Sequence, residues 1–495
     1  MQTHDNDNLK RRVALHNLGC KVNAYELDAV RELLLANGYE IVSFDEPADI
    51  YIVNTCTVTN IADRKSRQML HRAKKRSPEA VVVAMGCYVQ SRGEAASEDE
   101  AIDICIGNNR KTEIVRIIED YIEHRSSTPG AADDYYADNL SEPVEYEDMH
   151  LEKIDSHTRA YIKIQDGCNQ FCSYCMIPYA RGRVRSRKPE EVLAEIRALS
   201  ENGVSEFVVT GIHLSSYGTD FDIKGKIVPA DTFGPEHLLD ILTQISDVDG
   251  VKRIRLGSLE PRIMTEDFVQ RLSGLEKICP HFHLSLQSGS DTVLKRMNRH
   301  YDGAEYLECV DILRKYFDNP AITTDIIAGF PGETEEEFEQ SLCFAQKVGF
   351  FEMHIFPYSK RNGTPAAVMP GQLSEAEKAA RVGRLEAAEK KLSEAYRLTQ
   401  VGKTGEVLFE EMREFGGRKY FFGHTREYVK VLVPVDEEGT ALDGFGKKQQ
   451  LGQGLIATVL IRGLYDESED ENGSKGGTVG HGRMYVLADL INDQG

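Results

Sequence analysis

The chain has 495 residues, and a composition of 41% apolar and 28% charged residues is typical of a globular protein and excludes a largely disordered one. The 59 Lys and Arg residues against 80 Asp and Glu give a formal net charge of −21, which argues against a uniformly basic nucleic-acid binder but allows local basic patches. No apolar run reaches the roughly 18 residues of a membrane span, and residues 1–12 contain no apolar signal segment. We therefore expect a cytoplasmic protein with no membrane association, whose ten cysteines stay reduced.

Residues 10–122 alternate strands and helices in the pattern of an open parallel α/β domain. Strands are expected at 12–18, 49–54, 80–85 and 102–106, and helices at 24–37 and 61–75. A cysteine follows closely on each of the first three strands, at Cys20, Cys56 and Cys87. Because the carboxyl ends of parallel strands share one edge of a sheet, we expect these thiols to converge there. The alternative is three unconnected core thiols.

The rest of the chain divides into four segments. Residues 123–155 are polar and acidic and are predicted to form a linker with a mobile surface, or instead a packed extended arm. Residues 156–372 contain six strand–helix units, which predict a (β/α)6 barrel, complete or partial. Their strands are expected at 160–165, 206–210, 252–256, 282–286, 322–328 and 352–356. A capping-box pattern at Ser374 and Glu377 opens a connecting helix at 373–400, and short alternating runs over 401–490 predict a small β-barrel.

Cys168, Cys172 and Cys175 form a C-x3-C-x2-C motif, GCNQFCSYC, directly after the first expected barrel strand. Three thiolates in one tight loop can hold three corners of a 4Fe–4S cluster and leave the fourth iron without a protein ligand. Zinc is the alternative, but it usually takes four closed ligands, and no fourth ligand is evident in the sequence. We therefore expect a cluster with one open coordination position at this loop.

This motif, placed after a strand that opens a βα barrel, resembles the radical S-adenosylmethionine (SAM) enzymes. From about residue 12 to residue 463 the chain resembles one family of them, the methylthiotransferases, through segments such as NLGCKVN, VNTCTVT, GCYVQ, LSLQSGSDTVLKRMNR and DIIAGFPGET. That family joins an N-terminal three-cysteine domain to a radical SAM barrel and a C-terminal RNA-binding, OB-like β-barrel called TRAM. The resemblance implies two 4Fe–4S clusters, held by the two cysteine triads, and SAM as cofactors.

The resemblance also implies a reaction in two parts. Sulfur on the open iron of the N-terminal cluster would accept a methyl group from one SAM. A second SAM, cleaved at the barrel cluster, would give a 5′-deoxyadenosyl radical that removes hydrogen from the substrate. Gly211 matches a position where family enzymes bring backbone close to SAM, and Ser258, Glu260 and Gln287 face the cofactor if the barrel prediction holds. An electron donor such as flavodoxin or ferredoxin and a sulfur donor are the implied partners.

Basic runs in the acidic chain point to RNA. Arg181, Arg183 and Arg185 alternate in an expected extended segment, so that all three can face one groove, and the aromatic run at 420–422 lies among basic residues of the terminal barrel. The GCKVN form around Cys20 resembles the branch that modifies N6-threonylcarbamoyladenosine (t6A) at position 37 of tRNA, beside the anticodon. The alternatives are isopentenyladenosine in tRNA, an aspartate of a ribosomal protein, and a non-enzymatic iron–sulfur RNA-binding module.

Overall fold

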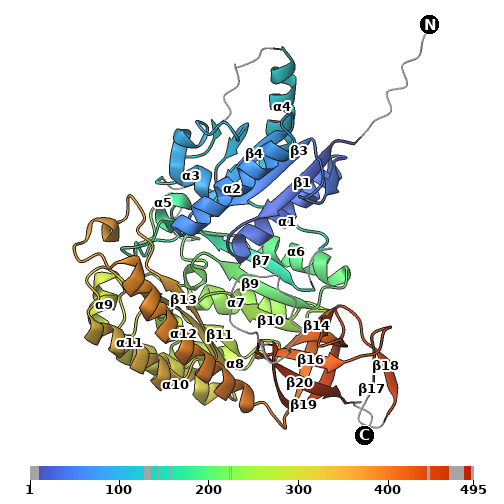
Figure 1. The fold of residues 1–495 in the computed structure, drawn as a ribbon, viewed down its shortest axis with the longest axis vertical. Coiled ribbons are helices and arrows are strands. Elements are labelled where there is room, and N and C mark those ends of the chain that lie inside the picture. Colours follow the sequence, from blue (N-terminus) through green and yellow to red (C-terminus); the bar gives the residue numbers. More distant parts are fainter. Residues whose placement is uncertain are drawn as a thin grey trace.

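A computed structural model describes residues 10–127, 135–142, 144–154, 158–221, 223, 226–442, 446–467 and 484–491. Figure 1 shows three parts in chain order: an N-terminal sheet domain in blue, a larger barrel domain from green to orange, and a small β-barrel in red. Among the described residues, no helix combines the length and apolarity needed to cross a membrane.

The N-terminal domain is an open sheet of parallel strands in the order β2-β1-β3-β4-β5-β6. The strands are β1 (Arg12–Asn17), β2 (Glu40–Val42), β3 (Ile50–Thr55), β4 (Val81–Gly86), β5 (Ile104–Ile106) and β6 (Tyr135–Tyr136). Helices α1 (Lys21–Ala36) and α4 (Ile114–Ser127) pack on one face, while α2 (Asn60–Arg76) and α3 (Cys87–Arg92) pack on the other. Cover on both faces explains why β3 and β4 are buried along their whole length.

The acidic stretch after α4 packs as an extended arm, the second of the two forms that the sequence allows. Residues 135–136 pair with β5 as the short strand β6. Farther along, Leu140, Met149 and Leu151 are buried, and the Tyr146 hydroxyl donates a 2.8 Å hydrogen bond to the Lys163 carbonyl. Apolar anchors at wide spacing therefore fix this segment between the first two domains, despite its acidic composition.

The barrel domain has six parallel strands in the order β7-β9-β10-β11-β12-β13, which confirms the predicted repeat. They are β7 (Ala160–Asp166), β9 (Glu206–Gly211), β10 (Arg253–Leu256), β11 (His281–His283), β12 (Ala321–Ala328) and β13 (Glu352–Pro357). Single bridges join β10 to the β11 side, and the short antiparallel β8 (Arg185–Ser186) borders β7. The described strands show no pairing between β7 and β13, so the barrel is partial.

Helices cover the outside of this arc and leave a polar inner face. The helices are α5 (Ile177–Ala180), α6 (Pro189–Glu201), α7 (Pro235–Ser246), α8 (Glu266–Ser273), α9 (Asp291–Arg296), α10 (Gly303–Tyr316) and α11 (Glu335–Val348). Short 3-10 helices lie at Gly93–Ala96, Lys111–Glu113, Leu214–Ser216, Pro261–Ile263 and Pro365–Val368. Phe282 and Ile322 belong to the apolar core, whereas the next residues along the same strands, His283 and Thr323, hydrogen bond to each other instead.

The C-terminal part begins with the long helix α12 (Glu375–Leu398), which has the predicted capping box between Ser374 and Glu377. A closed five-stranded barrel follows in the order β14-β15-β16-β20-β19, with only β16 and β20 parallel. Its strands are β14 (Thr404–Phe415), β15 (Arg418–Thr425), β16 (Lys430–Pro434), β19 (Ile456–Asp466) and β20 (Met484–Leu490), and a hairpin adds β17 (Thr440–Leu442) and β18 (Lys448–Gln450). The small barrel of the OB-like kind is thereby confirmed.

The small barrel docks at the amino ends of the large barrel's strands through the loop between β15 and β16. Tyr428 in that loop has a φ of +70°, and its hydroxyl accepts a 2.7 Å hydrogen bond from Arg159. Its ring lies 5.0 Å from the His281 ring and stacks 4.3 Å from the His424 ring. Arg255 on β10 donates hydrogen bonds to two carbonyls of the same loop. The strained Tyr428 backbone is thus held by contacts on every side.

Candidate active site

The three N-terminal cysteines converge at the carboxyl edge of the parallel sheet. Cys20 precedes α1, Cys56 follows β3, and Cys87 begins α3 directly after Gly86. The backbone at Gly19, with a φ of +116°, approaches so closely that an added Cβ would lie 3.2 Å from the Cys56 Cβ. Burial, followed by the neighbouring Cys87 and Cys20, raises the pKa of the Cys56 thiol to about 12. The sheet thus gathers three thiols that are far apart in sequence.

Asn108 connects this first triad to the segment that follows the second. Its side-chain amide lies 3.3 Å from the Cys87 sulfur as a donor and donates a 2.7 Å hydrogen bond to the Ala180 carbonyl. Ala180 ends α5, which begins two residues after Cys175. The buried Asn108 amide therefore contacts both Cys87, a candidate ligand of the first triad, and helix α5 next to the second triad.

The second triad lies in the loop after β7. At Gly167, with a φ of +72°, an added Cβ would lie 1.8 Å from the Arg183 carbonyl oxygen, so no side chain fits at the start of this loop. Arg299 donates a 3.3 Å hydrogen bond to the Cys172 sulfur, and the Ile177 amide donates a 3.4 Å bond to the Cys175 sulfur. Burial and the nearby Cys172 raise the pKa of Cys175 to about 12. The loop therefore presents sulfurs that already receive N–H donors, as cluster ligands do.

The donor set of each triad fits an iron–sulfur cluster with one open iron. All six cysteines are free. A structural zinc ion usually takes four closed protein ligands, whereas a cubic cluster can bind three thiolates and leave the fourth iron open. N–H donors already point at the sulfurs of Cys87, Cys172 and Cys175, as they do at cluster ligands. When bound, a cluster with an open iron supplies one-electron chemistry and a coordination position.

The four residues predicted to face SAM lie at the carboxyl ends of barrel strands or just after them. Gly211 ends β9, and an added Cβ there would lie 2.9 Å from the Gln165 side chain. Ser258 is exposed, whereas Glu260 is buried and pairs with Arg299 at 2.8 Å, which ties it to the Cys172 sulfur. Gln287 has a φ of +72°, a rare conformation for a residue with a side chain. Their contact with SAM stays a prediction.

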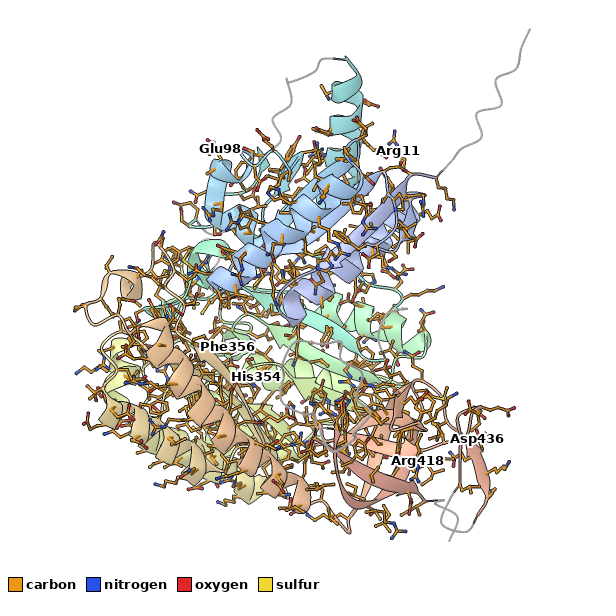
Figure 2. The ribbon with its side chains drawn as sticks, in the orientation of Figure 1. Arg11, Glu98, His354, Phe356, Arg418 and Asp436 are labelled. Atoms are coloured by element: carbon orange, nitrogen blue, oxygen red, sulfur yellow. The ribbon has the colours of Figure 1, made fainter. Side chains whose placement is uncertain are left out.

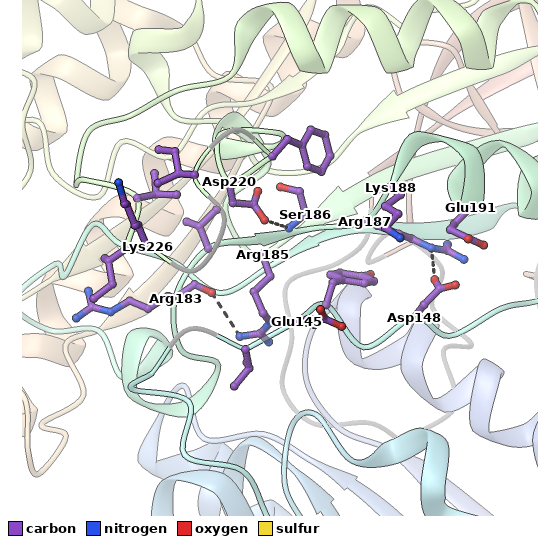
Figure 3. A pocket seen from close by; sticks show the side chains of 17 residues that line it. Glu145, Asp148, Arg183, Arg185, Ser186, Arg187, Lys188, Glu191, Asp220 and Lys226 are labelled. Atoms are coloured by element: carbon purple, nitrogen blue, oxygen red, sulfur yellow. Dashed lines mark hydrogen bonds and ion pairs between the residues drawn. The ribbon is translucent and has the colours of Figure 1, made fainter.

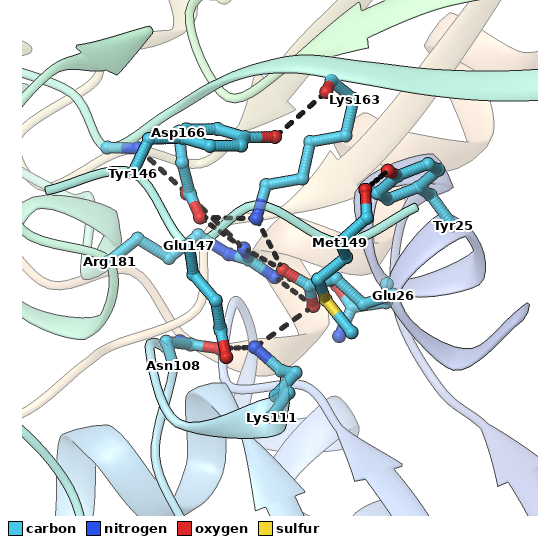
Figure 4. Close-up of polar contacts among 12 residues, drawn as sticks. Tyr25, Glu26, Asn108, Lys111, Tyr146, Glu147, Met149, Lys163, Asp166 and Arg181 are labelled. Atoms are coloured by element: carbon cyan, nitrogen blue, oxygen red, sulfur yellow. Dashed lines mark hydrogen bonds and ion pairs between the residues drawn. The ribbon is translucent and has the colours of Figure 1, made fainter. Parts of the chain in front are cut away.

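A buried charge cluster that the sequence did not reveal lies between the two triads. Figure 4 shows Glu26 on α1 surrounded by Lys111, Lys163 and Arg181, with Asp166 alongside. The Arg181 and Lys163 nitrogens lie 2.8 and 2.9 Å from Glu26 Oε1. Burial alone would raise the pKa of Glu26, but these cations hold it well below its usual range. We call these five residues the Glu26 cluster.

The Glu26 cluster carries more positive than negative charge. Its three cations face two carboxylates, and Arg185, also buried, adds a fourth cation 3.4 Å from Asp166. The pKa of Arg181 lies well above its usual value. Burial alone would lower this pKa, but nearby groups raise it, Cys87 more than any other. Surplus buried positive charge beside thiol groups stabilises thiolates and the negative charge of a cluster bound to them.

The three arginines predicted to contact RNA do not share one groove. Arg181 is fully buried in the Glu26 cluster. Arg183 and Arg185 line a pocket of about 520 Å³, seen in Figure 3. The Arg183 guanidinium stacks 4.7 Å from the centre of the Phe171 ring. Arg185 donates a 2.8 Å hydrogen bond to the Arg181 carbonyl. The expectation of a common groove therefore holds for two of the three. Of these, Arg183 is the more accessible, and contact of these arginines with RNA stays a prediction.

The aromatic run of the small barrel is not available to stack on bases. Tyr420, Phe421 and Phe422 are all buried, because they face the closed barrel and its neighbours. The basic and aromatic surface expected for RNA in this part therefore does not include these three rings, and RNA contact by its basic residues stays a prediction. Arg418 and Lys403 are exposed. The small barrel can therefore contact a phosphate backbone through these cations, without the buried aromatic rings.

Comparison with known proteins agrees with this geometry. Residues 162–345 match the Radical SAM superfamily, and residues 12–107 match the Uncharacterized protein family UPF0004. The solved structure of the radical S-adenosylmethionine methyltransferase TsrM from Kitasatospora setae, with cobalamin and a [4Fe-4S] cluster bound, has the same fold, with a TM-score of 0.52 and 17% identity. That likeness covers 73% of this chain and 77% of TsrM.

Relatives of higher identity span almost the whole chain. The threonylcarbamoyladenosine tRNA methylthiotransferase MtaB of Bacillus subtilis is 39% identical over 428 residues, which is 86% of this chain and 91% of that protein. MtaB of Aquifex aeolicus is 37% identical, covering 81% and 94%. The tRNA-2-methylthio-N(6)-dimethylallyladenosine synthase of Desulfitobacterium hafniense is 34% identical, covering 86% and 92%. With its radical SAM barrel, its N-terminal cysteine domain and these relatives, the chain belongs to the radical SAM methylthiotransferase family, whose cofactors are SAM and 4Fe–4S clusters.

Proposed function

We propose that this enzyme converts t6A at position 37 of tRNA to its 2-methylthio derivative. Three relatives named for threonylcarbamoyladenosine are 39%, 37% and 34% identical to it, and the relatives named for dimethylallyladenosine are 34% identical, so the two highest identities belong to the first group. The observation that carries the proposal is the placement of two cysteine triads on either side of Asn108 and Arg181. Sulfur transfer driven by a radical needs both metal centres near one substrate.

In this proposal Cys20, Cys56 and Cys87 hold one 4Fe–4S cluster, and Cys168, Cys172 and Cys175 hold the other. Arg299 and Asn108 donate hydrogen bonds to sulfurs of the two sets, which favours thiolate and tunes the potential of a bound cluster. Gly211, Ser258, Glu260 and Gln287 position SAM at the carboxyl ends of the strands. The buried Glu26 cluster keeps this region rigid and excludes water between the triads.

The RNA is held outside this centre. The small barrel serves as a TRAM domain, and Arg183, a partly exposed residue lining the 520 Å³ pocket, contacts the phosphate backbone. An electron donor such as flavodoxin or ferredoxin reduces the barrel cluster, and a separate sulfur donor renews the transferred sulfur. These partners follow from the stoichiometry, since each turnover consumes one sulfur atom and requires reducing equivalents.

Nucleoside mass spectrometry of tRNA from a deletion strain tests the function. Loss of 2-methylthio-t6A with accumulation of t6A, reversed by the wild-type gene but not by a Cys168→Ala copy, is the expected result. Loss of the methylthio derivative of isopentenyladenosine instead would transfer the enzyme to the other tRNA branch. An unchanged profile of methylthio nucleosides would refute a tRNA substrate.

A further inference from the structure

Helix α2 of the sheet domain exposes a row of cations. Figure 1 shows α2 along the outside of that domain. Its buried side consists of residues spaced three and four apart, as one helix face requires: Asp63, Ser66, Leu70 and Ala73. The basic residues on its exposed side are Arg64, Lys65, Arg67, His71, Arg72, Lys75 and Arg76. Asp63 is the sole acidic residue in the sequence of α2, and it lies on the buried side.

Acidic residues of other segments pair with basic residues in the second half of α2. The pairs are Arg72 and Arg76 with Asp45, His71 with Asp99, and Lys74 with Asp103. In the part of the chain that the structure describes, no ion pair or side-chain hydrogen bond involves Arg64, Lys65 or Arg67 of the first half. We call these three residues the α2 cation patch. Their charges are free to bind an anion.

The start of α2 contacts the barrel domain close to the first triad. Asn60 opens the helix four residues after Cys56. Its backbone N–H donates a 3.0 Å hydrogen bond to the Ser359 hydroxyl, and its side-chain amide donates a 2.9 Å bond to the Lys360 carbonyl. Both partners follow β13, at the carboxyl end of a barrel strand. Because Arg64 lies one turn after Asn60, the α2 cation patch lies where the sheet domain meets the carboxyl ends of the barrel strands.

Large apolar side chains face water at the same junction. Val58 and Ile61, on either side of Asn60 in the sequence, are 51% and 52% exposed. Phe356, three residues before Ser359, is 45% exposed, and Figure 2 labels it near the centre of the molecule. Surfaces that bind single-stranded nucleic acid combine cations, which contact the phosphates, with aromatic rings, on which bases stack. The junction around the α2 cation patch has both kinds of group.

Two kinds of anionic partner fit a group of unpaired cations: an RNA backbone and an acidic electron-donor protein. The position of the α2 cation patch favours RNA, because α2 follows Cys56 of the first triad, whereas an electron donor must approach the cluster that cleaves SAM. The residue types agree, since two of the three cations are arginines, whose planar forks match phosphate oxygens. The net charge of −21 repels RNA from the molecule as a whole, so the unpaired cations decide where RNA binds.

We propose that the α2 cation patch binds phosphates of the tRNA anticodon stem–loop, so that the sheet domain holds the RNA together with the small barrel. This deepens the proposed function and rests on its tRNA substrate, though not on which nucleoside is modified. Arg64 and Arg67 lie three residues apart on the helix and point in similar directions. Both can therefore contact one stretch of backbone, while Lys65 contacts its flank.

The salt dependence of RNA binding tests the α2 cation patch on the cluster-loaded enzyme. Fluorescence anisotropy gives the Kd of a labelled anticodon stem–loop carrying t6A at a series of salt concentrations. The variant Arg64→Gln/Lys65→Gln/Arg67→Gln should lower the slope of log Kd against log salt by about two to three, since each phosphate contact contributes about 0.7 to 0.9. At about 0.1 M salt its Kd should be about 100-fold higher than that of wild type, as a slope of two gives over the tenfold range to 1 M.

A matched variant on the same helix controls for total charge. Arg72→Gln/Lys75→Gln/Arg76→Gln also removes three exposed cations, centred roughly 13 Å farther along α2. That separation exceeds the Debye length of about 8 Å at physiological salt, so this variant should change the slope by less than about one. The iron content per chain should equal that of wild type in both variants, which shows that neither change disturbs the cluster near Cys56.

Several results would overturn the inference. An unchanged slope and Kd in the patch variant would refute the RNA contact, and equal losses in the two variants would show a general effect of charge. If the patch variant binds RNA as wild type does but needs several-fold more flavodoxin for half-maximal SAM cleavage, the patch is an electron-donor surface instead. If wild type binds no stem–loop, the proposed function fails as well. Binding through the patch with another nucleoside modified would refute the t6A assignment alone.

Discussion

Arg361 and Asp63 form a buried ion pair, 2.9 Å long, between the loop after the last barrel strand and helix α2 of the sheet domain. The same guanidinium donates 2.7 Å to the Thr57 hydroxyl and 2.6 Å to the Asn60 side chain. Thr57 directly follows Cys56. The barrel therefore fixes the loop that presents a thiol of the other domain, through residues some 300 positions away in the chain.

Arg361→Met should loosen that loop. Removing one partner of a buried pair leaves Asp63 uncompensated and costs about 3–5 kcal/mol of stability. We expect a lower thermal midpoint and loss of iron from the N-terminal triad, with the barrel cluster retained. Circular dichroism follows the melt, because the chain has no tryptophan. Arg271→Met, which breaks an exposed pair with Glu236, should change stability by less than about 1 kcal/mol and is the control. Full iron content in Arg361→Met would contradict the prediction.

Substitution of one cysteine from each triad tests the two-cluster assignment. Two clusters predict about eight irons per chain after anaerobic reconstitution, and Cys20→Ala and Cys168→Ala should each remove about half. Cys20→Ala should keep reductive cleavage of SAM, which Cys168→Ala should abolish. The variant Cys279→Ala serves as the control, since Cys279 is buried and its charged neighbours are Arg255, Glu206 and Arg253 rather than the cysteines of either triad. Four irons in wild type, or equal loss of SAM cleavage in both variants, would refute the assignment.

Glu26→Gln should destabilise the junction of the two domains. Glutamine leaves Lys111, Lys163 and Arg181 with Asp166 as the sole carboxylate among the five residues of the Glu26 cluster. The expected loss is about 3–5 kcal/mol, measured as a shift in the urea midpoint. Glu266→Gln removes an exposed negative charge that contacts Lys315 and the Tyr316 hydroxyl, and it should be nearly neutral. Similar midpoints for the two variants would show that the Glu26 cluster contributes little.

Glu206 gives a pH dependence of known sign. Burial alone would raise its pKa, but Arg255 and Arg159 lower it to about 2. A carboxyl whose pKa is lower in the folded state stabilises the protein above its unfolded pKa, near 4.5, and this contribution is lost as the pH falls toward 2. Above pH 5.5 the free energy of unfolding of wild type should exceed that of Glu206→Gln by roughly 3 kcal/mol, and this difference should disappear between pH 4.5 and 2. Thermal melts followed by circular dichroism across this pH range measure the difference. A stability difference that grows on acidification would contradict the lowered pKa of Glu206.

Most of the architecture could be predicted from strong periodic signals. The apolar run at β4, the six strand–helix units and the capping box at Ser374 all match the structure, because burial on one or two faces leaves a clear pattern in the sequence. Short edge strands leave no such pattern. The three residues of β2 and the two of β6 are too few to alternate visibly, and they exist because the neighbouring strand offers free hydrogen-bonding groups.

The site was predictable only where chemistry constrains residue type. The six cysteines stand at strand ends or in a tight loop, which topology alone brings together. The partners that hold them could not be predicted, since Arg299, Asn108 and Arg361 come from distant segments. Arg181 shows the limit most clearly. A run of alternating arginines has the same sequence pattern whether it faces RNA or a buried glutamate, and only the position of Glu26 on α1 separates the two.

Tyr428 contacts Arg159, His281 and His424. The small barrel is therefore an integral part of the structure and not a removable C-terminal domain. A chain shortened before β14 would uncover the guanidinium groups of Arg253 and Arg255 and admit solvent beneath the strands. Chimeras that exchange this domain between relatives should therefore lose radical chemistry because water enters the site, even when they still bind RNA. Exchanging the arginines and histidines that contact the domain together with it should prevent this loss.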